Sequence, residues 1–272
     1  METSSFRILT ALTGQEAPQL AQRPVTPVWL CYQVRSEPRV RGGPRLWRRE
    51  PPQKIRGGVL AAQDSPGLSH GDPEVCCMQA VRECRERQAK GFWANWSQPP
   101  SPVLSALTAA LDRALFAEGL TLYVNEPFAD CAPNAQVFLS SALSAGTLRL
   151  RLEEAQTRWG KRVALAVERM AEDFALPALD GQGQSLSPSR LEALRRQYAP
   201  RVHFSPEFCA SYFTYAQKEQ THLVLFDRTE DLVEKLHLAR SLGVERVLLA
   251  WQETGAACLD ALTAEFGWLC PG

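Results

Sequence analysis

One unit recurs along most of this chain: a capped helix, a glycine stop and then a short apolar strand. The clearest example begins at Ser101-Pro102, where serine suits the N-cap and proline the first helical position. Leucines follow at helical spacing, Gly119 ends the helix, and Leu120–Val124 is predicted to be a strand. Apolar strands that alternate with amphipathic helices indicate a parallel sheet covered on both faces. The chain is therefore predicted to be an α/β protein.

The same unit predicts five parallel strands of one sheet. They are Gly91–Ser97, Leu120–Asn125, Gln136–Ser140, Arg162–Val167 and Val244–Trp251. A closed (β/α)₈ barrel of the TIM type and an open doubly wound sheet both satisfy this pattern. A length of 272 residues suits one barrel, although two smaller domains would also fit.

The first part of the chain carries weaker signals. Phe6–Leu12, Val28–Val34 and Gly58–Ala62 are predicted strands, whereas the Pro-, Gly- and Arg-rich stretch 35–56 is predicted to be a long loop. A nucleic-acid-binding arm with Trp47 as a stacking residue is the alternative for this stretch. Its interrupting glutamates and prolines, and a net charge of zero for the whole chain, favour a loop and no nucleic-acid partner. Whether the first half of the barrel is abbreviated or irregular stays open.

Neither a membrane nor a cofactor is predicted as a partner. No apolar run approaches the length that a bilayer requires, and Met1–Gly14 is too weakly apolar for a secretory signal, so a cytoplasmic location is expected. The eight cysteines lack a framework spacing, and no histidine lies at a ligand spacing from a cysteine. Reduced thiols, no metal and no other cofactor are therefore expected.

The most informative motifs lie in the last third of the chain. In order they are Met170–Pro177, Ser211-Tyr-Phe-Thr-Tyr215, His222, Phe226-Asp227, Lys235-Leu236, Leu238-Ala239, Gly243-Val244 and Trp251. Their order and spacing resemble glycoside hydrolase family 18, and within it the spore- and cell-wall-associated subgroup. The first motif resembles the family's YGYDWTLP segment, and those that follow resemble its hairpin and last helix. The resemblance implies a single (β/α)₈ barrel over residues 1–272.

The resemblance also implies where a family member would carry out its chemistry. In that family a glutamic acid protonates the glycosidic oxygen while an aspartate orients the substrate's acetamide, in a fourth-strand pattern like D-G-x-x-x-D-x-E. In the best match here, Lys90 replaces the first aspartate, Asn95 the orienting aspartate and Ser97 the acid. A serine hydroxyl is far too weak an acid for this step. The resemblance therefore implies a catalytically degenerate barrel that binds an N-acetylglucosamine-containing glycan or a protein partner.

Four residues are predicted to form a ligand site at the carboxyl ends of the strands. Trp251 matches the family tryptophan beneath the sugar and offers a stacking surface, with a plain core tryptophan as the alternative. Asn95, Ser97 and Asn125 are expected to face the same end of the barrel. An asparagine at position 95 can hydrogen-bond an acetamide without supplying charge, which suits binding better than hydrolysis.

A relocated acid would make the chain an active glycosidase on chitin- or peptidoglycan-type glycans. Glu126 and Glu168 each follow a predicted strand on the side where such barrels have their active sites, and Gln252-Glu253 follows Trp251. Either Glu126 or Glu168 would then donate the proton. Solvated loop charges are the simpler interpretation of these carboxylates.

Other polar and aromatic positions are given structural interpretations. Trp93 and Trp96 cannot face the same side of one strand, so one is expected in the barrel and the other against the helices. His222 is interpreted as structural and Asp173 as the cap of a turn. Neither a nucleophile elbow nor a phosphate-binding glycine loop is present in the sequence.

Overall fold

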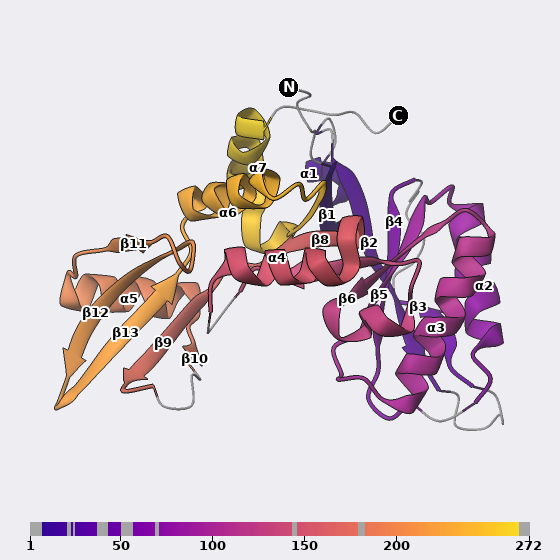
Figure 1. The fold of residues 1–272 in the computed structure, drawn as a ribbon, viewed down its shortest axis with the longest axis horizontal. Helices are drawn as coiled ribbons and strands as arrows, with labels where there is room; N and C mark the ends of the chain where they lie inside the picture. Colours follow the sequence, from indigo (N-terminus) through magenta and orange to yellow (C-terminus); the bar gives the residue numbers. More distant parts are fainter. Residues whose placement is uncertain are drawn as a thin grey trace.

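A closed barrel of eight parallel strands forms the body of the molecule, with β14 pairing back onto β1 (Figure 1). The computed structural model describes residues 7–20, 23, 25–36, 43–49, 57–68, 71–142, 146–178 and 183–266. The barrel strands, in order around the ring, are β1 (Arg7–Leu12), β2 (Thr26–Arg35), β4 (Val59–Asp64), β5 (Gly91–Asn95), β6 (Thr121–Asn125), β7 (Gln136–Ser140), β8 (Val163–Val167) and β14 (Arg246–Ala250). The barrel prediction is confirmed, and the open sheet is excluded.

The first half of the barrel has its full complement of strands but an irregular outer layer. Among the described residues between β1 and β2, a single helical turn, α1 (Ala17–Leu20), is present. Between β2 and β4 the described residues contain β3 (Arg45–Arg48), which pairs antiparallel with β2. The prediction that 35–56 is a long loop is therefore wrong for β3, because pairing with a distant strand overrides its loop-like composition. Residues 37–42 and 50–56 lie outside the described part.

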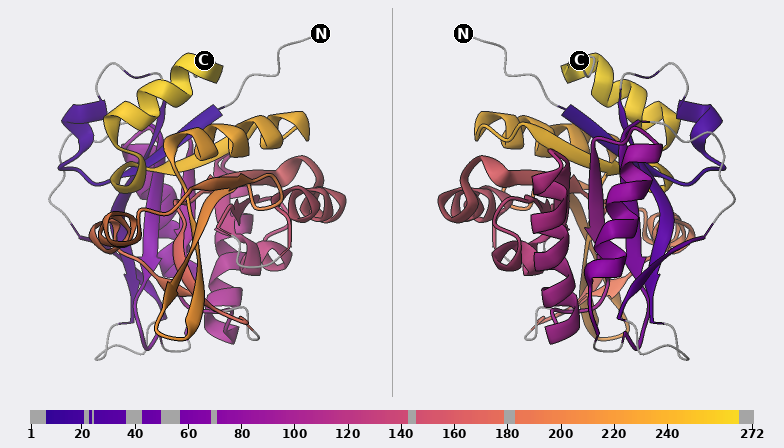
Figure 2. Two further views of the ribbon diagram at one scale, coloured as in Figure 1. Left: turned by 90° about the vertical axis from the view of Figure 1, so that its left-hand side faces the viewer. Right: turned by 90° about the vertical axis from the view of Figure 1, so that its right-hand side faces the viewer.

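The outer layer elsewhere consists of longer helices. They are α2 (Glu74–Glu86), α3 (Pro102–Ala117), α4 (Leu148–Trp159), α6 (Thr229–Ser241) and α7 (Trp251–Phe266), with short 3₁₀ turns η1 (Glu126–Cys131) and η2 (Gly160–Arg162). Ser101 and Thr147 accept hydrogen bonds from backbone amides three residues on, as N-cap side chains do. Helices α2 and α3 lie side by side on the outside of the barrel (Figure 2). Among the described residues no helix has the length and apolarity needed to cross a bilayer.

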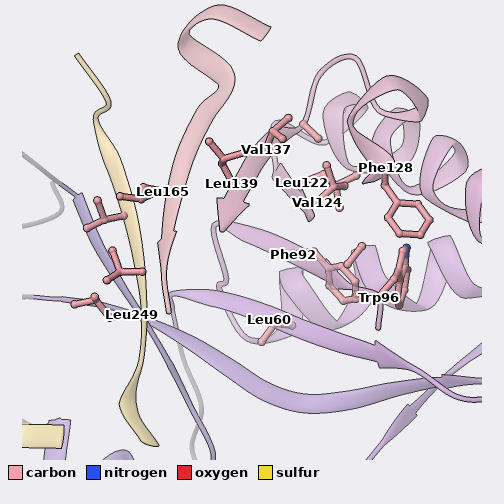
Figure 3. Packing of buried hydrophobic residues seen from close by; sticks show 14 of the residues in the cluster. Leu60, Phe92, Trp96, Leu122, Val124, Phe128, Val137, Leu139, Leu165 and Leu249 are labelled. Atoms are coloured by element: carbon pink, nitrogen blue, oxygen red, sulfur yellow. The ribbon is translucent and has the colours of Figure 1, made fainter. Parts of the chain in front are cut away.

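Alternation along each barrel strand separates two apolar layers. On β5, Phe92 lies in the layer between the strands and the helices, whereas Trp93 lies inside the barrel. Figure 3 shows the outer layer, where Phe92, Trp96 and Phe128 come together. Trp96 there donates a hydrogen bond from Nε1 to Thr108 Oγ1 at 2.8 Å. The prediction that Trp93 and Trp96 face opposite sides is confirmed.

A second sheet is inserted between β8 and α6. It is antiparallel, in the order β10-β9-β13-β12-β11, and one helix packs against it (Figure 1). Its elements are β9 (Ala171–Leu176), β10 (Gln184–Ser185), α5 (Pro188–Tyr198), β11 (His203–Ser205), β12 (Ala210–Gln217) and β13 (Gln220–Phe226). The hairpin implied by the resemblance is present as β12 and β13. Strand β11 pairs antiparallel with β12 at one edge of this sheet.

The two ends of the insertion meet at one buried ion pair. Asp227 N donates to the Met170 carbonyl at 2.9 Å, and Met170 N donates to Asp227 Oδ2 at 2.8 Å. Lys235 Nζ of α6 lies 2.7 Å from the same Oδ2, and both side chains of this pair have no exposed surface. The chain therefore leaves and rejoins the barrel at neighbouring points that Lys235 holds together.

Candidate functional site

A cavity of about 470 Å³, here called the mouth cavity, opens at the carboxyl ends of the barrel strands. Its apolar wall comes from the inside of the barrel and includes Trp93, Phe138 and Leu248. The rings of Trp93 and Phe138 meet edge to face with centroids 5.3 Å apart. Polar side chains line the rim: Asn95, Asn125, Glu126, Ser140, Arg151, Glu168 and Glu253. This end of a parallel barrel is where the strands bring residues from distant parts of the sequence together.

Two predicted site residues, Asn95 and Asn125, are linked by a hydrogen-bonded chain at the ends of β5 and β6. Trp93 Nε1 donates to Asn125 Oδ1 at 3.1 Å. Asn125 Nδ2 donates to Asn95 Oδ1 at 3.3 Å and to the Trp96 carbonyl at 3.1 Å. The Asn125 amide is thereby fixed, and the Asn95 amide nitrogen makes no hydrogen bond to the described residues. Asn95 is consequently a donor available at the rim of the mouth cavity.

The third predicted residue, Ser97, faces away from the mouth cavity. Its backbone amide and its hydroxyl donate to Asp64 Oδ1, at 2.7 and 2.9 Å. Gln98 donates to Asp64 Oδ2 from its backbone and from its side chain. Burial opposes ionisation of Asp64, but these hydrogen bonds outweigh it and hold the pKa of the carboxyl below its usual range. Ser97 therefore does not line the mouth cavity with Asn95 and Asn125, as the sequence had led us to expect. Strand β5 ends at Asn95, and the hydrogen bonds to Asp64 hold Ser97 elsewhere.

Trp251 is also misplaced by the sequence prediction. Its side chain is only 6% exposed and lies in the apolar layer between the strands and the helices. The guanidinium carbon of Arg23 lies 5.7 Å from its ring centroid. Strand β14 ends at Ala250, whose side chain lines the mouth cavity, so the next side chain points to the other face. Trp251 therefore does not line the mouth cavity, contrary to the prediction that it forms the base of the ligand site. Among the described tryptophans, Trp93 is the one that lines the cavity.

Three carboxylates line the mouth cavity, and each has a defined hydrogen-bond donor. Glu126 begins η1 and accepts from Arg151 of α4 at 2.5 Å. Glu168, directly after β8, is exposed and accepts from the Ser140 hydroxyl at 2.7 Å. Glu253, in the first turn of α7, accepts from a backbone amide at 2.9 Å. Both predicted alternatives for an acid, Glu126 and Glu168, therefore lie at the mouth.

Sequence reasoning gave no role to Arg151. It lies inside an amphipathic helix, where an arginine signals only a solvated face. A pairing of Arg151 with Glu126 depends on how α4 packs beside β7, and no local pattern encodes that. The strand-end rule had instead pointed to Glu126, since carboxyl ends of parallel strands meet at one rim.

A separate polar cluster lies in the second sheet, on the face covered by α5. Tyr215 donates to Asp173 Oδ2 at 2.6 Å, and His222 Nδ1 lies 2.9 Å from Asp173 Oδ1. Burial, together with the hydrogen bond to Asp173, raises the pKa of the Tyr215 hydroxyl. Asp173 lies within β9, so the prediction that it caps a turn is wrong. These contacts join β9, β12 and β13 and give His222 a structural setting.

Within the described ranges, no group of three or more histidine, cysteine or acidic side chains gathers as a metal site would require. The seven described cysteines form no disulfides. Burial raises the pKa of Cys77 and Cys84 to about 12, which leaves both as unreactive thiols near neutrality.

Comparison with known proteins gives matches in structure but none in sequence. In sequence, neither a family model nor a curated protein matches the chain. In structure, the spore cortex-lytic enzyme SleL of Bacillus megaterium superposes with a TM-score of 0.66 at 14% identity, over 100% of this chain and 76% of that one. The chitinase of Chromobacterium violaceum gives a TM-score of 0.65 at 15% identity, over 95% of this chain and 98% of that one.

A third solved structure carries the family name. The glycoside hydrolase family 18 N-acetylglucosaminidase of Paenibacillus barengoltzii gives a TM-score of 0.64 at 13% identity, over 96% of this chain and 99% of that one. Identities this low establish a common fold and leave function to the residues of the site. The chain thus has the barrel fold of glycoside hydrolase family 18 enzymes, as the order of its C-terminal motifs implied.

Proposed function

We propose that the mouth cavity binds amino-sugar glycans that contain N-acetylglucosamine, and that the barrel does not hydrolyse them. The observation that carries this proposal is the position of Ser97, which stands where the family pattern has its acid and is tied to Asp64 outside the cavity. A general acid must reach the glycosidic oxygen and have a pKa near the working pH. A serine hydroxyl meets neither requirement.

The remaining groups suit the recognition of an acetamide. Asn95 stands at the family's orienting aspartate and offers an amide that Asn125 holds in place. Trp93 offers apolar surface against which a sugar face can pack. The chitinase and the N-acetylglucosaminidase of the same fold are named for action on such glycans. The proposal is that the ligand class is retained here and the hydrolysis is not.

An active glycosidase with a relocated acid is the second candidate, because Glu126 and Glu168 both line the mouth cavity. Glu126 accepts from a guanidinium group, an arrangement suited to an ionised carboxylate rather than to a proton donor. Glu168 has only a hydroxyl partner and is exposed, so it is the better donor of the two. Turnover that Glu168→Gln abolishes would establish this alternative.

Calorimetric titration with N-acetylglucosamine oligomers, together with a turnover assay on the same oligomers and on peptidoglycan, tests the proposal. We expect binding without turnover. Asn95→Ala should weaken binding roughly 3- to 10-fold, the value of one hydrogen bond. Ser97→Ala is the matched control and should leave binding unchanged. No heat of binding at millimolar oligomer would contradict the proposal.

A further inference from the structure

Charge is distributed unevenly around the mouth cavity. Among its described lining residues, Arg151 is the only basic one, whereas Glu126, Glu168 and Glu253 are acidic. Arg151 forms its ion pair with Glu126. Glu168 and Glu253 accept instead from uncharged donors, a serine hydroxyl and a backbone amide. The cavity therefore has two carboxylates without a cationic partner among the described residues.

These two carboxylates lie close together along the rim. Glu253 Oε2 accepts from the backbone amide of Arg169, the residue that follows Glu168. Glu168 stands at the end of β8, and Glu253 in the turn after β14, the neighbouring strand. The amides of Asn95 and Asn125 stand at the ends of β5 and β6, farther round the barrel. A ligand that spans the cavity therefore meets amides on one side and negative charge on the other.

The charge arrangement discriminates among amino sugars. A fully acetylated sugar is neutral and would cover both carboxylates without giving them an ionic partner, which is unfavourable. A sugar that carries a carboxylate would meet like charge at Glu168 and Glu253. A free amino group is protonated at mildly acidic pH, and an ammonium offers three donors to acceptor-only carboxylates.

We propose that the Glu168–Glu253 side of the mouth cavity binds the protonated amine of a de-N-acetylated sugar unit. The preferred ligand is then a partly de-N-acetylated amino-sugar polymer, with an acetylated unit at Asn95 and a glucosamine unit at the carboxylates. This inference rests on the proposed function, since it assumes an amino-sugar ligand in the mouth cavity. It goes beyond that function by stating that the ligand carries a positive charge and that Glu168 and Glu253 recognise this charge.

The test compares three oligomers of equal length by calorimetry between about pH 5 and 6, where the free amine of a sugar is protonated. The oligomers are fully acetylated, partly de-N-acetylated and fully de-N-acetylated. An exposed ion pair is worth a factor of roughly 1.5 to 5 in affinity, so two pairs should favour the partly de-N-acetylated oligomer over the acetylated one roughly 2- to 25-fold. Salt near 1 M, where the screening length is about 3 Å, should abolish most of this preference.

Matched variants locate the effect. Glu168→Gln and Glu253→Gln each remove one charge from an exposed side chain. Each should lose part of the preference, because affinity for the partly de-N-acetylated oligomer falls relative to affinity for the acetylated one. Glu219→Gln removes the same charge from the exposed turn between β12 and β13 and should leave the preference intact. Circular dichroism confirms that each variant is folded.

The outcomes separate this inference from the proposed function. Equal affinity for acetylated and partly de-N-acetylated oligomers would overturn the amine site and leave the proposed function standing. A preference that survives in both glutamine variants, or in high salt, would also overturn it. Binding of the fully de-N-acetylated oligomer alone would support the amine site and contradict the acetamide site at Asn95. No binding of any oligomer would overturn both.

Discussion

Asp64 determines where the chain goes after β5. It lies at the end of the neighbouring strand β4 and is almost wholly buried. Four hydrogen bonds from Ser97 and Gln98 converge on its two carboxylate oxygens. Asp64 therefore holds Ser97 and Gln98 away from the mouth cavity, whose lining contains neither residue.

We expect Asp64→Asn to destabilise the protein by about 2 kcal/mol near neutrality, because hydrogen bonds to a charged acceptor are worth about 1.5–3 kcal/mol. The pKa of the folded carboxyl is lowered, so its contribution is present above the unfolded value of about 3.9 and is lost as pH falls through the folded pKa. Urea unfolding at pH 7 and pH 3 measures the difference, which should shrink at pH 3.

Ser97→Ala is the matched control for this prediction. It removes one of the four hydrogen bonds and leaves the carboxylate in place, so it should cost less than Asp64→Asn. If Asp64→Asn lowered the free energy of unfolding by the same amount at pH 7 and pH 3, the charge-based explanation would be contradicted.

Gly91 shows a second constraint at the scale of one residue. It begins β5, and a Cβ built on it would lie 2.5 Å from the Thr121 carbonyl oxygen. We expect Gly91→Ala to cost about 1–3 kcal/mol, the range for overpacking, because backbone of β6 would have to move. Thermal unfolding followed by circular dichroism measures this, and an unchanged midpoint would show that the two strands can separate without cost.

At the scale of elements, the sequence predicted those helices and strands whose ends and faces depend on residues close together in the chain. The N-cap at Ser101, the stop at Gly119 and the apolar runs predicted helix α3 and the barrel strands within a few residues. Of the second sheet, the resemblance implied only the β12–β13 hairpin. The rest had no local signal, because β9 pairs with β13, about fifty residues later in the chain. Such pairing is specified by packing between distant segments and not by the pattern within either one.

The same division holds for the candidate site. Asn95, Asn125, Glu126 and Glu168 were predicted from strand ends, and the structure brings them to one rim. Trp251 was predicted wrongly because Ala250, the last residue of β14, already lines the mouth cavity, and successive side chains along a strand point to opposite faces. Arg151 could not be predicted, since its role depends on the packing of a helix.

The buried pair Lys235–Asp227 fastens α6 to both ends of the second sheet. We expect Lys235→Met to destabilise the protein by about 3–5 kcal/mol, because it leaves a buried carboxylate without its partner. The double variant Asp227→Asn/Lys235→Met removes both charges and should recover much of that loss. Urea unfolding of Lys235→Met, of Asp227→Asn and of the double variant gives the coupling energy between the two side chains. Strictly additive losses would contradict a direct ion pair.

At the scale of the whole molecule, the second sheet is an insertion whose two ends join the barrel at neighbouring points. Met170 and Asp227 are joined by hydrogen bonds in both directions, so the chain leaves and rejoins the barrel at one place. None of the barrel strands pairs with a strand of the second sheet in the described part of the chain. The barrel's ring of strands is closed without the insertion.

We therefore expect a variant in which a short glycine-serine linker replaces residues 171–226 to keep a folded barrel. It should unfold in one cooperative urea transition, with a smaller dependence on urea concentration because less surface is exposed on unfolding. The comparison is made against the full chain by near-ultraviolet circular dichroism. A variant without a cooperative transition would show that the second sheet is required for the barrel to fold.

Closure of the ring by β1 and β14 has a consequence during synthesis on the ribosome. Strand β1 is among the first barrel strands to be made, and β14, one of its two neighbours, is the last. At about 5–20 residues per second, the interval between them is on the order of ten to fifty seconds. Until β14 emerges, β1 and β8 each keep an edge that can pair with another nascent chain. The strands of the second sheet, which are contiguous in the chain, can pair before the barrel closes.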